Sequence, residues 1–76
     1  EQTLSAAAAR GDINAVRRIL ARGGDPNATD EHGRTALFIA AMNGNLEVGK
    51  ELLHNGARVD QQDIRGWTPL MAAAEK

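Results

Sequence analysis

The sequence predicts an all-α fold built from a repeated pair of short helices, and three observations support this prediction. The segment DEHGRTALFIAA, which begins at Asp30, returns as DIRGWTPLMAAA at Asp63, 33 positions later. The part of the chain before Asp30 matches the part after it at the same offset without a gap. Threonine, glycine and apolar residues recur where helices would start, end and bury a face. A regular period of this length is typical of a repeat array.

Each unit is predicted to contain two helices followed by a polar loop. The second helix carries aliphatic residues at helical spacing, which predicts one buried face. These residues are Ile13, Val16, Ile19 and Leu20 in the first unit and Leu46, Val48, Leu52 and Leu53 in the second. Paired alanines in the first helix let neighbouring helices approach closely. The expected first helices are about 4–10, 36–43 and 69–75, and the expected second helices are about 13–22 and 46–54.

Residues with known capping preferences bound the first helix of each unit. Thr35 and Thr68 are expected to be N-caps, because a threonine hydroxyl accepts a backbone N–H that the first helical turn leaves free. Pro69 follows Thr68 at the first helical position, where its missing N–H removes no helical hydrogen bond. Gly11 and Gly44 are expected to end the first helices, since the residue after a helix often needs a positive φ.

Composition excludes several function classes. The chain has 76 residues and no cysteine, so we expect one small domain without disulfides or thiolate metal sites, as in an intracellular protein of the cytoplasm or nucleus. A net charge of −1 gives no basis for binding nucleic acid or an anionic membrane, and the longest apolar run is far too short for membrane insertion. His32, His54 and Ser5 form no pattern of a catalytic or metal site. We therefore expect no enzymatic activity, no metal, no cofactor and no small-molecule substrate.

The 33-residue unit, of the form D-x-x-G-x-T-P-L-x-x-A-A-x-x-G followed by a helix and G-A, resembles the ankyrin repeat. The resemblance covers the whole chain and implies a solenoid of antiparallel helix pairs joined by projecting turns. It divides a single domain, 1–76, into a first repeat without its leading turn (1–29), a complete second repeat (30–62) and the opening of a third (63–76).

Some positions depart from the family pattern. The histidine that usually follows T-P-L is replaced by Ser5, Phe38 and Met71, so its hydrogen bonds are expected to be missing. Gly49 stands inside a second helix, where glycine costs roughly 1 kcal/mol relative to alanine. Repeat arrays need about three units for stability. We therefore expect either a larger native array or a marginally stable fragment.

The resemblance implies protein–protein recognition, with a partner protein docking on the concave side formed by the turn tips and the exposed face of the first helices. Leu37, Ala40, Leu52 and Leu70 are expected to be framework residues. The expected partner-binding residues are Glu31, His32, Arg34, Met42, Asn43, Ile64, Arg65 and Trp67.

Trp67, the one tryptophan, matches Arg34 at the repeat offset and so occupies a variable tip position. It is expected either to lie flat against the adjoining turn, over Arg34 or His32, or to be a hot spot for a partner, and we favour the second reading. Phe38 is expected to pack between units.

Two other functions stay open. The start LSAAAARGDINAVRRIL is similar to the opening of the ankyrin-type inhibitors of cyclin-dependent kinases, although the second unit here is regular instead of shortened. The tripeptide Arg10-Gly11-Asp12 spells a cell-adhesion motif, but its glycine also serves as the expected helix stop.

Overall fold

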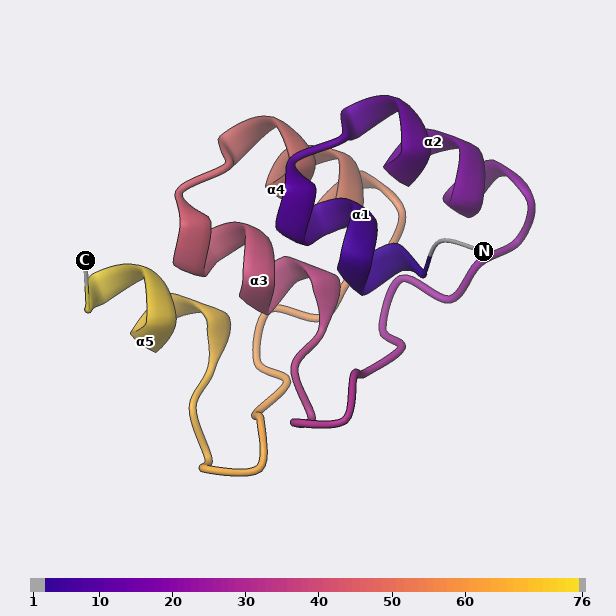
Figure 1. The fold of residues 1–76 in the computed structure, drawn as a ribbon. Coiled ribbons are helices and arrows are strands. Elements are labelled where there is room, and N and C mark those ends of the chain that lie inside the picture. The colour runs from indigo at the N-terminus through magenta and orange to yellow at the C-terminus, as the bar shows by residue number, and fades with distance from the viewer. Residues whose placement is uncertain (1–2, 76) are drawn as a thin grey trace.

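The computed structural model describes residues 3–75, which form five helices in two layers (Figure 1). The first two inner helices are each followed by a tight turn and an antiparallel outer helix, and the inner helices lie side by side. Two long loops, 22–35 and 55–68, project from the same end of the helices (Figure 1). The predicted all-α stack of helix pairs is confirmed. The inner helices are α1 (Leu4–Arg10), α3 (Ala36–Asn43) and α5 (Pro69–Ala74), and the outer helices are α2 (Ile13–Ala21) and α4 (Leu46–His54).

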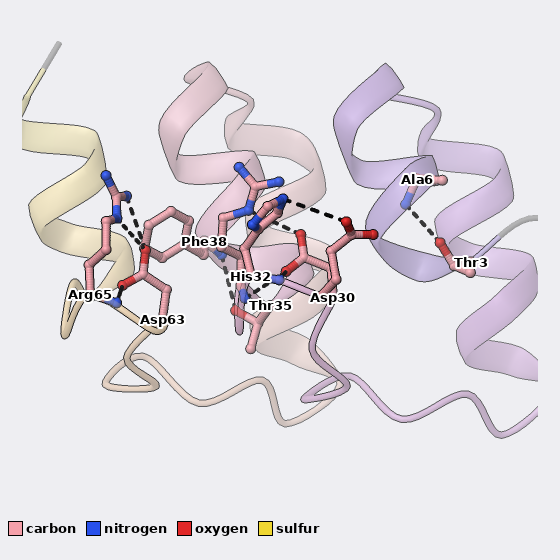
Figure 2. Close-up of polar contacts among 10 residues, drawn as sticks. Thr3, Ala6, Asp30, His32, Thr35, Phe38, Asp63 and Arg65 are labelled. Carbon is pink, nitrogen blue, oxygen red and sulfur yellow. Dashed lines mark hydrogen bonds and ion pairs between the residues drawn. The ribbon is translucent and has the colours of Figure 1, made fainter.

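The inner helices begin and end as their sequence predicts. Thr35 and Thr68 each accept a hydrogen bond at Oγ1 from the backbone N–H three residues later, at 3.2 and 3.3 Å. Thr3 caps α1 in the same way at 3.1 Å (Figure 2). Gly11 and Gly44 end α1 and α3 with φ angles of 68° and 70°, which a residue with a Cβ rarely adopts.

The outer helices are capped by the residue that follows each of these glycines. Asp12 and Asn45 accept the backbone N–H of Ala15 and Val48 at 3.1 and 3.2 Å. Asp12 also pairs with Arg10 at 3.4 Å. The Arg10-Gly11-Asp12 tripeptide therefore forms the turn between α1 and α2, where both of its charged side chains have partners.

Small and aliphatic side chains fill the core between the layers. Alanines on one side of the inner helices are buried, which brings α1 and α5 each close to α3; these residues are Ala7, Ala8, Ala36, Ala40 and Ala72. Of the paired alanines at the repeat offset, Ala73 and Ala74 of α5 are exposed. Phe38 is fully buried, as expected for a residue packed between units. The largest fully buried apolar side chains are Phe38, Leu52, Val16 and Val48.

Three leucines expected in the core are exposed. Leu46 and Leu53, predicted on the buried face of α4, are 77% and 46% exposed, and Leu70, predicted as a framework residue, is 77% exposed. The matching Leu20 and Leu37 are only 9% and 7% exposed. The difference follows from position in the stack. The next unit packs on Leu20 and Leu37, because α4 contacts α2 and α5 contacts α3, but no described helix packs on the far side of α4 and α5.

Candidate interaction surface at the turn tips

The first projecting turn is organised by the carboxylate of Asp30. Its Oδ1 accepts the backbone N–H groups of His32 and Arg34, both at 2.9 Å. Its Oδ2 accepts the Nε of Arg34 at 3.0 Å. Two backbone hydrogen bonds close the turn: Asp30 N–H donates to the Arg34 carbonyl and Gly33 N–H to the Asp30 carbonyl, at 2.9 and 3.0 Å. One aspartate thereby fixes both the backbone and an arginine side chain.

The second turn repeats this arrangement around Asp63, with a different arginine (Figure 2). Oδ1 of Asp63 accepts the backbone N–H groups of Arg65 and Trp67, both at 2.9 Å. Oδ2 accepts Nε and Nη2 of Arg65 at 3.1 and 3.0 Å. The guanidinium of Arg65 lies 4.9 Å from the centre of the Trp67 ring, within cation–π range. The second tip therefore presents a fixed pair of an arginine and an indole.

The two turns are joined to each other by their backbones. Ile64 N–H donates to the carbonyl of His32 at 3.1 Å. Gly33 has a φ of 75°, and a Cβ there would come within 3.0 Å of the Ile64 nitrogen. Glycine is needed at this position both for its backbone angle and for this close approach. The tips of the two turns consequently form one continuous surface.

Hydrogen bonding lowers the pKa of both turn aspartates below the ordinary value. For Asp63, desolvation is the largest single effect and raises the pKa, but donation from the backbone of Trp67 and from the side chain and backbone of Arg65 together outweighs it. The pKa of Asp30 is lowered in the same way, by the backbone of Arg34 and His32 and the Arg34 side chain. Both carboxylates are therefore ionised at neutral pH and hold the turns through charge-assisted hydrogen bonds.

Comparison with known proteins adds to this geometry. A family model described as ankyrin repeats, three copies, matches residues 4–76. The chain belongs to the ankyrin repeat family. It is 51% identical over 67 residues, 88% of the chain, to the potassium channel KOR1 of Oryza sativa subsp. japonica. It is 37% identical over 68 residues, 90% of the chain, to the RelA-associated inhibitor of Mus musculus. The chain spans 8% of the length of each of these relatives.

A third relative is the putative palmitoyltransferase ZDHHC13 of Danio rerio, 34% identical over 67 residues, which are 88% of this chain and 10% of that protein. The ankyrin repeat is a general protein-interaction module and typically has no enzymatic activity of its own. Within residues 3–75, no group of three histidine, aspartate or glutamate side chains is placed to hold a metal ion. No helix among these residues has the length and apolar character needed to cross a membrane.

The structure distributes the predicted partner-binding residues of this ankyrin array over two regions. Six of them lie on the turn tips, and Met42 and Asn43 lie at the opposite end of α3. Arg65 of the same turn lies over the Trp67 ring. The exposed residues of the predicted set are Glu31, His32, Asn43, Ile64 and Arg65, and the partly buried ones are Arg34, Met42 and Trp67.

Sequence reasoning missed the role of the two aspartates in the tips. Asp30 and Asp63 were noted only as matching positions of the repeat. The signal was available, because aspartate often accepts N–H groups of the residues that follow it in a turn. Reasoning from the sequence also missed an apolar groove of about 380 Å³ between α3, α4 and α5, lined in part by Leu37, Leu46 and Leu53.

Proposed function

We propose that this chain binds a partner protein through the tips of its two projecting turns, with Trp67 as the central contact. The observation that supports this most directly is the fixed pair of Arg65 and Trp67. Arg65 is held by two hydrogen bonds to Asp63 and stacks on the Trp67 ring, so binding need not order either side chain. Tryptophan and arginine are also the residues most enriched at interface hot spots.

The surface around this pair has both apolar and charged parts. Ile64 is 74% exposed and follows Asp63 directly. On the neighbouring turn, the side chains of Glu31 and His32 are 88% and 56% exposed. An apolar centre beside exposed polar groups is the usual composition of a protein interface. Met42 and Asn43 would extend the contact along α3.

The proposal that the partner is a protein also agrees with the name of one relative. The mouse protein is called the RelA-associated inhibitor, a name that records association with another protein. We propose a protein partner for this chain on the same grounds, without assigning RelA to it, and a cytoplasmic or nuclear location. Inhibition of a cyclin-dependent kinase stays a prediction from the sequence, since no contact among the described residues favours it over another protein partner.

Trp67→Ala tests the proposal. We expect this variant to lose partners that wild type retains in affinity purification, and to bind an identified partner about 30-fold more weakly, equivalent to ~2 kcal/mol. Arg22→Ala is the matched control, because Arg22 is exposed after α2, outside the two tips, and its loss should leave binding unchanged. Circular dichroism of each variant verifies the fold. Equal affinity of Trp67→Ala and wild type, with both folded, would overturn the proposal.

A further inference from the structure

An asparagine directly followed by a glycine is prone to spontaneous loss of its side-chain amide, because glycine has no side chain to hinder its backbone nitrogen. The chain contains two such pairs, Asn43–Gly44 and Asn55–Gly56. Both lie where a helix ends: Gly44 follows α3 with a φ of 70°, and Gly56 follows the C-cap of α4 with a φ of 89°. A residue with a Cβ rarely adopts these angles, so the fold requires both glycines.

The reaction at such a pair needs only water. The glycine backbone nitrogen loses its proton and attacks Cγ of the asparagine. A new C–N bond closes a succinimide ring, and the side-chain amide leaves as ammonia. Water then opens the ring at either carbonyl. One opening gives aspartate, and the other gives isoaspartate, in which the main chain runs through the former side-chain carbon.

The structure restrains Asn55 more strongly than Asn43. Nδ2 of Asn55 donates to the backbone carbonyl of Glu51 at 2.8 Å and lies 3.4 Å from Glu51 Oε2. The carbonyl of Gly56 accepts Nδ2 of Asn27 at 3.2 Å. The Asn55 amide must therefore break a hydrogen bond before its Cγ can meet the Gly56 nitrogen.

Asn43 has no such restraint, since its side chain forms no hydrogen bond with another residue in the part of the chain that the structure describes. It is the exposed last residue of α3, and Gly44 N–H donates to the carbonyl of Ala41 at 3.2 Å, in a terminal turn that opens more readily than a helix centre. Arg10, at the matching position of α1, is also exposed although α3 packs beside α1. A neighbouring unit therefore leaves this position open to water.

We propose that Asn43–Gly44 is a site of spontaneous deamidation and that Asn43 is converted faster than any other asparagine of the chain. The remaining asparagines, Asn14, Asn27 and Asn45, each precede a residue that carries a side chain, which hinders attack by its backbone nitrogen. The site is therefore defined by two features together: a glycine that the helix end requires, and an asparagine amide that no neighbour holds.

Conversion acts on the turn that joins α3 to α4. In this turn Gly44 N–H donates to the Ala41 carbonyl, and Asn45 N–H donates to the Ala40 carbonyl at 2.9 Å. Isoaspartate adds an extra carbon to the main chain, so these two hydrogen bonds cannot both keep their geometry. Either product also places a negative charge at the C-terminal end of α3, where the helix dipole is already negative. The converted chain is therefore less stable than the original one.

Peptide mapping of the folded chain tests the proposal. Trypsin, which cleaves after arginine and lysine, places Asn43 on peptide 35–50 and Asn55 on peptide 51–58. The chain is incubated in mildly alkaline buffer, and both peptides are followed over time by mass spectrometry and by labelling with an isoaspartyl methyltransferase. Free peptides of the same sequences give the rates without the fold. We expect similar rates in the free peptides, and at least about 5-fold faster conversion of Asn43 than of Asn55 in the folded chain.

Two variants control for the assignment of each signal. Asn43→Arg introduces the residue type of the matching Arg10 and should abolish conversion on peptide 35–50, which also contains Asn45. Asn55→Arg introduces the residue type of Arg22 in the same way and should leave the rate at Asn43 unchanged. Equal rates at Asn43 and Asn55 in the folded chain, or faster conversion of Asn55, overturn the proposal. So does conversion on peptide 35–50 that persists in Asn43→Arg.

The effect on the turn is measured separately. The converted chain carries an additional negative charge, so ion exchange separates it from the original one. We expect the isoaspartate form to have a lower urea midpoint than the unconverted chain. A converted form with an unchanged midpoint would show that the α3–α4 turn does not depend on the geometry of Asn43, and would overturn this part of the proposal.

Discussion

Asp63 is the residue on which the second turn tip depends. Its side chain is only 1% exposed and accepts two backbone N–H groups and two guanidinium N–H groups. A carboxylate without these partners would be poorly solvated at such a position. The aspartate and the Arg65–Trp67 pair therefore form a single unit, in which the buried charge determines where the exposed side chains lie.

Asp63→Asn tests this dependence. We expect a lower urea midpoint at pH 7, because the amide replaces a charged acceptor. The pKa of Asp63 is lower in the folded chain than in the unfolded one, so its contribution is present above the unfolded pKa and is lost as the pH falls through the folded pKa. The difference in urea midpoint between variant and wild type should therefore shrink below about pH 4.

Asp60→Asn is the control for this measurement. The side chain of Asp60 is 73% exposed, and its ion pair with Arg58 is long, at 3.7 Å. Exposed ion pairs of this kind contribute little to stability. The control should therefore have the urea midpoint of wild type both at pH 7 and below about pH 4. A midpoint difference for Asp63→Asn that persists unchanged in acid would contradict the assignment of its effect to the ionised carboxylate.

At the scale of the element, glycine has opposite roles in the two helices of the second unit. Gly44 ends α3 with a φ of 70°. Gly49 lies inside α4, where its backbone is helical and positive φ is not required. A Cβ added at Gly49 would meet Leu37 Cδ1 at 3.8 Å, an ordinary contact, and a Cβ at Gly44 would meet no atom within 4 Å. The two positions thus differ in backbone conformation and not in available space.

Gly49→Ala and Gly44→Ala should therefore change stability in opposite directions. Alanine at position 49 is expected to stabilise the chain by up to about 1 kcal/mol, through helix propensity. Alanine at position 44 should destabilise it by roughly 1–2 kcal/mol, because an L-residue is strained at positive φ. Urea unfolding of both variants, monitored by circular dichroism, measures the two values. Destabilisation by Gly49→Ala would show that α4 needs glycine for a reason other than propensity.

On the scale of the whole molecule, the chain is small and leaves several large apolar side chains exposed. A domain of this size buries only about 60% of the surface its unfolded chain exposes. Leu46, Leu53, Leu70 and Met71 remain exposed, so they add little burial to a fold that has few units. Most of the core depends on α3, which contacts α1, α4 and α5.

This organisation predicts marginal stability for the isolated chain. We expect a single cooperative transition with a urea midpoint below about 3 M. A midpoint of several molar would be inconsistent with a marginally stable chain.

Much of this molecule could be predicted from local sequence. Thr35, Thr68, Gly11 and Gly44 act within one helical turn, so their roles follow from residue type and position. Burial of Phe38 followed from its place between units. The exposure of Leu70 could not be predicted in this way, because Leu37 occupies the same repeat position and is buried. Burial depends on which element packs against a residue, and that is a property of the stack.

The pair of Arg65 and Trp67 also has one feature that the sequence predicts and one that only the tertiary structure determines. The repeat offset alone predicted that Trp67 occupies a variable position of a turn tip, because the offset is found directly in the sequence. Which side chain covers its ring was decided by the tertiary structure: Arg65 reaches both Asp63 and the indole, whereas in the first turn Arg34 pairs with Asp30. The sequence alone determined the repeat, the helices and the caps, because these depend on short-range geometry. The exposure of Leu70 and the fixed tip pair required the folded chain, because they depend on contacts of residues that the repeat pattern treats as equivalent.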